Sequence, residues 1–397
     1  MAGKKLRVAV QGCCHGELNK VFAAVDRMHR QNPIDLLIIL GDFQSLRSPE
    51  DLKSISIPQK YQKMGDFHQY YQNDSFRAPV FTIIIGGNHE SMRHLMELPY
   101  GGYIANNMFY LGYSSVVWFK GLRIAGLSGI WKHWDFDKER PTIQELEVNN
   151  NWNKRVRELY HVRKADIMPL FMINKPIDIC ISHDWPSGAA QYGNVAELLR
   201  SKPFFERDIN NGELGNPLTW ELLRKLQPKY WFSAHLHVKY TALINHGKRG
   251  LISDAQNKRQ KKNEDEIDLD LESDSDESNI KDSVPDDPRE TFFMSLDKCM
   301  PRRQWLEVLE IETSNSEISD DNFYWDPEYI YALRKINENQ KYLRKTNFNT
   351  IDWSKYHMVD APHPNIYYRI QEYSPGIQRQ ESEQTSQFKA KFFEKSE

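Results

Sequence analysis

The stretch L-R-V-A-V-Q-G-C-C-H-G, residues 6–16, contains the pattern that decides the fold. A short β-rich run, residues 6–10, ends in a turn made of glycine, cysteine and histidine, and a helix-like segment follows. The same pattern recurs along the first 240 residues. The other runs, each with its polar end, are 36–40 with Gly41 and Asp42, 81–85 with Gly86 to Glu90, 177–181 with Ser182 to Asp184, and 230–233 with Ala234 to His237.

These runs are apolar on both faces, which is typical of central strands covered on both sides by other layers. In a sheet flanked by helices, ligands collect where such strands end. Residues 116–127 instead predict a hairpin that turns at Lys120 and Gly121. The pattern as a whole predicts an α/β fold.

Every predicted strand end carries a side chain that can bind a metal ion. Each one alone has an ordinary explanation, since Gly-Asp is a common turn and a lone histidine usually packs in a core. Together they supply enough ligands for two metal ions, and the paired cysteine spacings of a structural zinc site are absent from the sequence. The candidate ligands are Cys13, His15, Asp42, Asn88, His183, His235 and His237.

Composition narrows the class of protein. Four cysteines in 397 residues are not a disulfide framework and favour a reducing compartment, and no apolar run is long enough to cross a bilayer. We therefore expect a soluble intracellular protein. The net charge of −3 hides an uneven distribution, because residues 264–287 hold twelve acidic residues and one lysine. The remainder is basic, which is compatible with a polyanionic substrate without requiring one.

The chain divides by composition into four parts. Residues 1–244 carry the strand pattern, 245–290 are expected to be an acidic disordered linker, 291–345 are ordered again, and 346–397 look like a mostly polar tail. The basic run 258–262 within the linker is a candidate nuclear-import signal.

The order of the strand-end motifs resembles that of the calcineurin-like metallophosphoesterases, D-x-H, G-D, G-N-H-E, H and G-H-x-H. Two positions depart from it, because Cys13 stands where aspartate is usual and Ala234 where glycine is usual. The cysteine variant resembles the lariat debranching enzymes, the fungal members above all. The stretches that carry this resemblance are G-C-C-H-G, L-L-I-I-L-G-D-F-Q-S, G-G-N-H-E-S-M-R-H-L, S-G-I-W-K-H-W-D-F, Y-H-V-R, S-H-D-W-P and D-K-C-M-P-R-R.

The resemblance implies a β-sandwich flanked by helices, with a smaller C-terminal region packed on it. It also implies hydrolysis of the 2′–5′ phosphodiester at the branch point of an excised intron lariat. One metal ion would be held by Cys13, His15 and His237, the other by Asn88, His183 and His235, with Asp42 between them. Because alternate residues of a strand face opposite sides, the D-x-H spacing selects Cys13 rather than Cys14.

By the same resemblance, His89 is the general acid that protonates the 2′ leaving group. A hydrogen bond to a neighbouring ligand is the structural alternative for this histidine. A thiolate among imidazoles favours iron(II) or zinc over magnesium, with manganese as a substitute.

A segment rich in tryptophan and basic residues, about 131–158, matches the position of the loop with which the family holds the lariat and has no clear periodicity. Rings and cations together suit single-stranded or branched RNA, although some of these rings could instead lie in the core. The candidate RNA contacts are Trp131, Trp134, Trp152, Arg155, Tyr160 and Arg163, together with Arg93 and His94 after the third strand.

Two other functions stay open on sequence alone: another RNA-directed or protein-directed metallophosphoesterase, and a non-catalytic RNA-binding scaffold. The expected partner is branched intron lariat RNA, and splicing or intron-turnover factors are candidate protein partners. Neither membrane nor DNA binding is expected. The substrate places the protein in the nucleus, with the cytoplasm left open.

Overall fold

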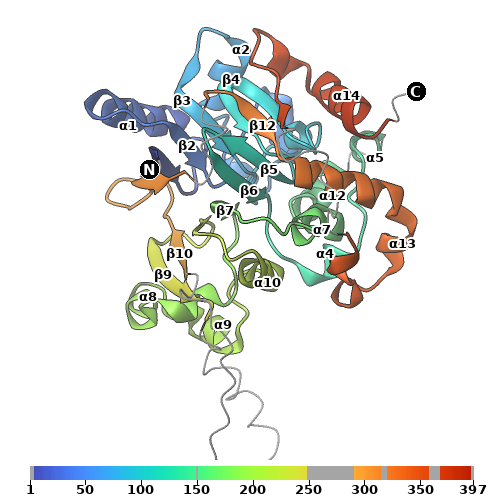
Figure 1. The fold of residues 1–397 in the computed structure, drawn as a ribbon. Coiled ribbons are helices and arrows are strands. Elements are labelled where there is room, and N and C mark those ends of the chain that lie inside the picture. The colour runs from blue at the N-terminus through green and yellow to red at the C-terminus, as the bar shows by residue number, and fades with distance from the viewer. Residues whose placement is uncertain (1–3, 149–150, 248–289, 314–319, 357–366, 395–397) are drawn as a thin grey trace, which may run out of the picture.

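The computed structural model describes residues 4–148, 151–247, 290–313, 320–356 and 367–394, and these form two stacked sheets covered by helices (Figure 1). The first sheet has the strand order β11 (Leu306–Glu312), β1 (Lys5–Gln11), β2 (Leu36–Ile39), β3 (Arg77–Ile84) and β4 (Gly102–Tyr110). The second has the order β13 (Tyr368–Arg369), β12 (Phe323–Trp325), β5 (Ser114–Phe119), β6 (Leu122–Leu127), β7 (Ile179–Ser182), β8 (Tyr230–Ser233), β10 (Glu290–Ser295) and β9 (Tyr240–Asn245). All five predicted strands, and the hairpin of β5 and β6, are present.

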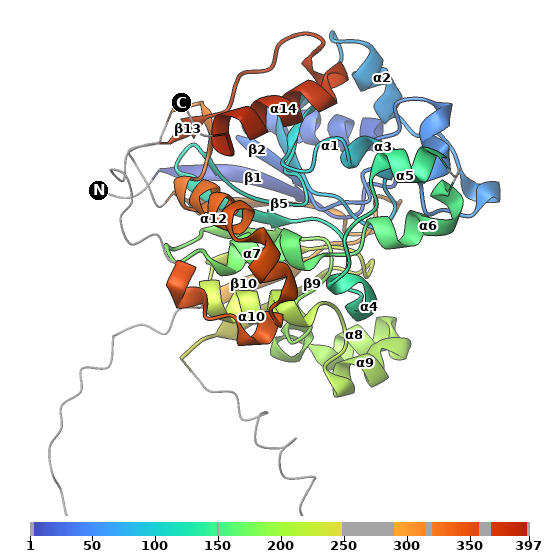
Figure 2. The same ribbon diagram turned by 90° about the vertical axis from the view of Figure 1, so that its right-hand side faces the viewer.

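Helices cover the outer faces of both sheets (Figure 2). The α-helices are α1 (Leu18–Gln31), α2 (Phe67–Gln72), α3 (Met92–Leu95), α4 (His133–Phe136), α5 (Ile143–Val148), α6 (Trp152–Leu159), α7 (Lys164–Phe171), α8 (Val195–Ser201), α9 (Glu206–Asn211), α10 (Pro217–Leu226), α12 (Pro327–Glu338), α13 (Gln340–Lys345) and α14 (Glu381–Phe392). Short 3-10 turns are η1 (Pro49–Ser54), η2 (Gln59–Tyr61), η3 (Ala189–Tyr192), η4 (Pro203–Phe205), η6 (Phe348–Thr350), η7 (Trp353–Tyr356) and η8 (Ile377–Arg379). Helix α1 packs on β3, α2 and α14 pack on β4, and α7 packs on β5 and β6.

Side chains of the first sheet pack into two separate cores, one on each face of the sheet. Val8, Val10 and Ile38 face the second sheet, whereas Ala9 and Leu37 face α1 on the outer side. All five side chains are fully buried, as expected for strands that are apolar on both faces. The alternation continues past the end of β1, where Cys13 belongs to the inner core and Cys14 to the outer one. All four cysteines of the chain are free and buried.

Strands from the C-terminal region complete both sheets, so this region is built into the sandwich. β11 pairs antiparallel with β1, β10 pairs with β8 and β9, and β12 pairs antiparallel with β5. A buried ion pair supports the last junction, because the Arg123 guanidinium on β6 donates to Asp326 at 2.7 Å and to Glu328 at 2.9 Å. The ordered C-terminal part of the chain is therefore required for both sheets to be complete.

The sequence expectation of a polar tail after residue 346 is wrong for the part of it that the structure describes. Helix α14 buries Phe388 and Phe392, and Phe388 stacks on Tyr100 with ring centroids 4.8 Å apart. Glu381 at its first turn pairs with Arg47 at 3.0 Å. Widely spaced aromatic residues among polar ones were enough to bury one side of this helix.

The expectation of a long irregular loop over residues 131–158 is also wrong in part. Helices α4, α5 and α6 occupy most of it, and Leu146, Trp152 and Leu159 pack with Met92 in a small core of their own. Because these helices have four to eight residues, they are too short to show a helical period in the sequence.

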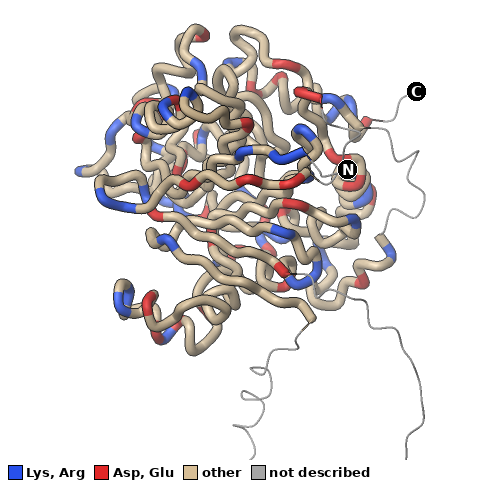
Figure 3. Tube along the Cα trace, turned by 60° about the vertical axis from the view of Figure 1, so that its left-hand side comes forward, with Lys and Arg blue, Asp and Glu red and all other residues tan. Residues whose placement is uncertain are grey.

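Basic and acidic residues alternate along the described backbone instead of separating into two faces (Figure 3). The acidic segment and the basic run 258–262 lie outside the described residues, apart from 245–247 and Glu290 at its ends. Within the part of the chain that the structure describes, no helix combines the length and apolar character needed to cross a bilayer.

We predict that Arg123→Ala lowers the free energy of unfolding by about 3–5 kcal/mol, because it leaves Asp326 and Glu328 buried without a counter-charge. Urea unfolding followed by tryptophan fluorescence measures the change. The exposed Lys341→Gln on α13 is the control. A loss below about 1 kcal/mol would contradict a supporting role for the pair.

Candidate metal centre and phosphoesterase site

The ends of β1, β2, β3, β7 and β8 bring the predicted ligands together. Several of the turns that follow these strands use left-handed backbone, with positive φ at His15, Asp42, His235 and His237. Such angles are uncommon outside glycine and occur at functional sites that the fold holds in place. Four of the seven candidate ligands therefore lie on left-handed backbone, a conformation that five other non-glycine residues of the described chain share.

Glycine is required next to the ligands because the backbones approach closely. A Cβ on Gly41, which has a φ of +102°, would lie 2.5 Å from Nδ1 of His183. A Cβ on Gly87 would lie 2.4 Å from Oδ1 of Asp42. The glycines of the G-D and G-G-N-H motifs thus keep space for the side chains of other motifs.

One group of candidate ligands is compact enough for a metal ion. Ligand atoms of Cys13, His15, Asp42 and His237 all lie within 4.8 Å of one another. Nε2 of His15 and Nε2 of His237 are 3.0 Å apart, so two ring nitrogens face the same point. Cys13 reaches this group and Cys14 points to the other core, as the strand alternation predicts.

Asp42 lies at the centre and lacks the partners that a buried carboxylate needs. Its side chain is 1% exposed, and Oδ2 has no hydrogen-bond partner. Burial alone would raise its pKa, but His183, His15 and His89 hold the pKa of this carboxyl well below its ordinary value. A buried, ionised carboxylate with an unused oxygen fits a position between two cations.

The second group of candidates adjoins the other oxygen of Asp42. Nε2 of His183 lies 3.4 Å from Oδ1 of Asp42 and 3.3 Å from Oδ1 of Asn88. Nδ1 of His183 lies 2.6 Å from the carbonyl oxygen of Leu40, a contact in which Nδ1–H donates and Nε2 stays free as a ligand. His235 lies beside His183, with ring centroids 5.2 Å apart. The backbone N–H of His235 donates to Sγ of Cys13 at 3.3 Å.

The electrostatics suit metal binding. Burial lowers the pKa of His237 to about 3, with a further contribution from His15, and burial also lowers the pKa of His15 and His235. These imidazoles therefore stay neutral and keep a lone pair for a cation at neutral pH. Burial and Asp42 raise the pKa of the Cys13 thiol, so the thiol keeps its proton while no cation is bound. A cation that binds to Sγ would have to displace this proton.

His89 has its ring at the edge of the centre. Nδ1 lies 3.0 Å from the carbonyl oxygen of Ser56, and the ring centroid is 5.6 Å from that of His15. Its backbone N–H donates to Oδ1 of Asp42 at 2.8 Å. Since Nδ1–H is used by Ser56, Nε2 is the atom left to exchange a proton.

Two supporting residues were not selected from sequence. The buried carboxylate of Glu90 accepts hydrogen bonds from the backbone N–H groups of Phe43, Gln44 and Gly87, and so ties the loop after Asp42 to the loop before Asn88. Glu90 is the last residue of the G-N-H-E motif, and this position could have identified it from the sequence. Ser56 acts through its backbone carbonyl, which leaves no signal in the sequence.

Four of the predicted RNA contacts are buried, and that prediction is corrected for them. Trp152 and Arg163 are 2% exposed and Tyr160 is 9% exposed. Arg163 donates to the carbonyl oxygens of Asp135 and Glu158. His94 is fully buried between the Ser45 carbonyl and Glu381. Part of this segment packs into a small core of its own. Its composition does not distinguish residues of such a core from residues of an RNA-binding surface.

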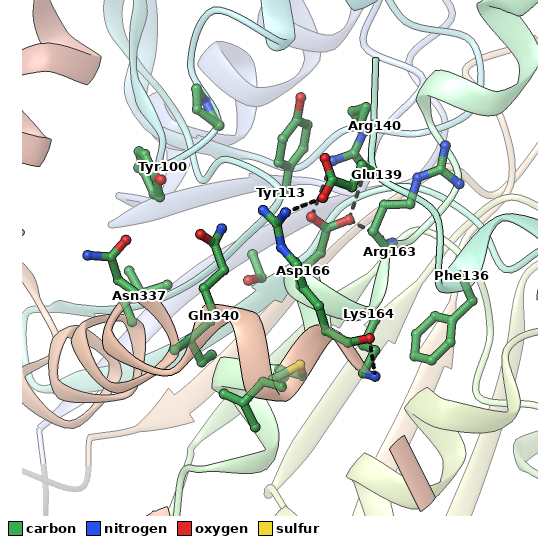
Figure 4. Close-up of a pocket in the computed structure, with 18 of the residues that line it drawn as sticks. Tyr100, Tyr113, Phe136, Glu139, Arg140, Arg163, Lys164, Asp166, Asn337 and Gln340 are labelled. Atoms are coloured by element: carbon green, nitrogen blue, oxygen red, sulfur yellow. Dashed lines mark hydrogen bonds and ion pairs between the residues drawn. The ribbon is translucent and has the colours of Figure 1, made fainter. Parts of the chain in front are cut away.

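Arg163 also borders a cavity of about 330 Å³ between α7 and the helices α12 and α13 (Figure 4). There Arg140 pairs with Asp166 at 2.9 Å and stacks over the ring of Tyr113. At the same cavity Arg344 of α13 pairs with Glu139, and its carbonyl oxygen accepts from Nζ of Lys164, so polar contacts join α13 to the body.

The other four candidates reach the surface. The ring of Trp134 is 54% exposed, with Nζ of Lys132 at 5.6 Å from its centroid. Trp131 is half-buried against Phe136, and its backbone N–H donates to Asp184 beside His183 at 3.1 Å. Arg93 pairs with Glu147 and Arg155 pairs with Glu158, and both arginines are partly exposed.

Comparison with known families agrees with this geometry. The calcineurin-like phosphoesterase profile matches residues 6–239, which include all seven candidate ligands. The fold and the site therefore define a metallophosphoesterase. A second profile, the lariat debranching enzyme C-terminal domain, matches residues 288–393.

Related proteins identify the branch. A lariat debranching enzyme of Saccharomyces cerevisiae is 53% identical, covering 98% of this chain and 99% of that protein. One from Schizosaccharomyces pombe is 41% identical over 85% of this chain and 80% of its own length. A human one is 40% identical over 84% of this chain, which spans about half of the human protein. The chain belongs to the lariat debranching enzyme family.

We predict that Cys13→Ala binds one metal ion fewer per chain, whereas Cys14→Ala keeps its full metal content. Both thiols are fully buried, so the pair is matched for the loss of packing. Elemental analysis of protein purified without oxygen measures the difference. Equal metal content in the two variants would exclude Cys13 as a ligand.

We predict that His94 makes the protein sensitive to acid. Burial, with Arg47 beside it, lowers the pKa of His94 to about 4, and Glu381 and Asp51 offset part of this. Below its unfolded pKa of about 6.5, only the unfolded chain takes up the proton, so stability present at pH 7 falls by about 3 kcal/mol by pH 4. Unfolding of His94→Gln should lack this part of the pH dependence. An identical slope of unfolding free energy against pH in the variant and the native protein would contradict the assignment to His94.

Proposed function

We propose that this chain hydrolyses the 2′–5′ phosphodiester bond at the branch point of excised intron lariat RNA. The observation that carries the proposal is the buried Asp42, whose Oδ2 has no partner and which lies among a thiol and imidazoles in a chain of this family. In this proposal Cys13, His15 and His237 would hold one ion, Asn88, His183 and His235 would hold the other, and Asp42 would supply its carboxylate to both.

Two divalent ions bound there would supply an activated water and polarise the phosphoryl oxygens. The chain's own residues fix the geometry. Glu90 holds the loops that carry Asp42 and Asn88, and the Leu40 carbonyl fixes the ring of His183. Because these groups are set before substrate binds, little reorganisation is needed when charge develops on the phosphate.

The reaction consumes one water and moves two protons. The water oxygen bonds to phosphorus and releases one proton to solvent, from which His89 is later reprotonated, while the bond from phosphorus to the 2′ oxygen breaks in line. His89 delivers the proton from Nε2 to the leaving 2′ oxygen, and the Ser56 carbonyl stabilises the protonated ring at Nδ1. The products are a 2′-hydroxyl and a 5′-phosphate.

The exposed side chains of the segment rich in tryptophan and basic residues, about 131–158, support RNA binding. Trp134 offers an open ring face beside Lys132, an arrangement suited to stacking an unpaired base next to a phosphate. Trp131 precedes Trp134 by three residues, and its hydrogen bond to Asp184 ties the segment to the candidate metal centre. Arg93 and Arg155 are partly exposed cations that we propose as further RNA contacts.

The remaining assignments follow from this function. A thiolate ligand favours iron(II) or zinc, with manganese as a substitute. We propose 1–244 as the catalytic domain and the residues from 291 onward as the part that completes its sheets. An enzyme that acts on excised introns would reside in the nucleus and meet splicing or intron-turnover factors.

A comparison of substrates tests the activity. Protein purified without oxygen should cleave a 2′–5′ branched RNA and leave both a 3′–5′ linear RNA and a phosphopeptide intact. Equal cleavage of the branched and linear RNAs would point to a general nuclease. Failure of metal-loaded protein to cleave any substrate would favour a non-catalytic scaffold.

We predict that His89→Gln lowers turnover of branched RNA by about 10²- to 10⁴-fold. The variant keeps the backbone hydrogen bond to Asp42, so its metal content should match that of the native protein. A phosphodiester with a nitrophenolate leaving group needs no proton from an acid, and its hydrolysis should fall far less. An equal loss on both substrates would show that His89 positions the site and does not act as the acid.

A further inference from the structure

A second basic surface lies on the other side of the candidate metal centre from the tryptophan segment. It is a groove of about 660 Å³ between α8, the start of β9 and the loop 297–304. In Figure 1, α8 and β9 lie at the lower left, whereas α4, which carries Trp134, lies at the right. We call it the α8 groove.

The α8 groove is connected through the backbone to the turns that carry two candidate ligands. Val238 and Lys239 on its wall directly follow the candidate ligand His237. Next to Asp297 of the opposite wall, the backbone of Lys298 forms a β-bridge with Cys13, and the backbone N–H of Cys299 donates to the Cys13 carbonyl at 2.9 Å.

The groove concentrates cations that have too few counter-charges. Arg303 pairs with Asp297 at 3.0 Å and Lys239 pairs with Glu307 at 2.6 Å. Arg302 lines the groove and forms no ion pair among the described residues. The same holds for Lys202 and Lys298, which lie outside the lining but directly follow the lining residues Ser201 and Asp297. Glu197 is the other acidic group of the lining, and it accepts the side-chain N–H of Asn194.

Lys202, which directly follows the lining residue Ser201, lies among these charges. Burial lowers its pKa, and Arg303 and Lys298 lower it further against the opposing effect of Asp297. A cation held among cations is stabilised when an anion enters, because the anion removes the repulsion.

The surroundings favour a nucleic acid over a small anion. Phe204, directly after the lysine and proline that open η4, is 69% exposed, and Nζ of Lys202 lies 5.9 Å from its ring centroid. An exposed ring beside a line of cations is the arrangement that binds single-stranded chains. Asp297 holds the loop in place, since it accepts from the backbone N–H of Lys298 and from Arg303.

We propose that the α8 groove binds the phosphodiester backbone of an RNA arm that leaves the branch point. This rests on the proposed function and adds a second contact region to it. The phosphates lie against Arg302 and against Lys202 and Lys298 beside the lining, and a base stacks on Phe204.

The test measures binding of two branched RNAs to holoprotein carrying His89→Gln, so that the substrates stay intact. One RNA is a minimal branched trinucleotide, and the other has ten-nucleotide arms. The double variant Lys202→Gln/Arg302→Gln is compared with Lys341→Gln, an exposed lysine on α13 outside the groove. Both groove residues are solvent-accessible, so their replacement should leave the fold intact.

We expect the double variant to reduce the preference for the long-armed RNA about tenfold, and Lys341→Gln to leave this preference as it is. The slope of log binding constant against log salt should fall by about 0.7 for each RNA phosphate that the variant no longer neutralises. An unchanged preference and slope would overturn the α8 groove as an RNA site. Separately, failure of the native protein to cleave the minimal branched RNA would overturn the proposed function, while the binding preference would still report on the groove.

Discussion

The buried carboxylate of Asp42 is the constraint on which the rest of the structure depends. It is held ionised away from water, with one oxygen unpartnered and imidazoles on several sides. Such a group is costly to bury unless positive charge is supplied. The left-handed turn at Asp42 and the glycines around it keep the carboxylate where strands of both sheets end.

The C-terminal strands matter because the centre lies between two sheets. β11 flanks β1, which leads to Cys13 and His15, and β10 flanks β8, which leads to His235 and His237. The Arg123 ion pairs fix β12 and α12 to β6, and Glu381 on α14 reaches the network of Arg47 and His94 near the start of α3. Residues after 290 therefore support the positions of ligands that all precede them in sequence.

The sequence was sufficient for the strands because they leave strong local patterns. Runs that are apolar on both faces predicted β1, β2, β3, β7 and β8, and of the candidate ligands at their ends the structure groups Cys13, His15, Asp42 and His237. The alternation of a strand also separated Cys13 from Cys14.

What the sequence left out depends on long-range packing. Trp152 and Arg163 lie in polar surroundings along the chain, yet they pack inside because α5 and α6 form a small core with Met92 and Met96. The sparse phenylalanines of α14 give no clear period, and their burial depends on distant rings: Phe388 packs on Tyr100 and Trp325, and Phe392 packs on Tyr368. The backbone carbonyl of Ser56 orients His89, and every residue type has such a carbonyl, so no sequence motif can predict this contact.

The most direct test of this account is anomalous X-ray scattering from crystals of protein purified without oxygen. The account predicts two metal peaks about 3.5–4 Å apart with an Asp42 oxygen between them. One peak should be bonded to Sγ of Cys13 and the other to Oδ1 of Asn88. A single peak, or a peak pair without a bond to Cys13, would contradict the assignment of this site as a two-metal centre with a thiolate ligand.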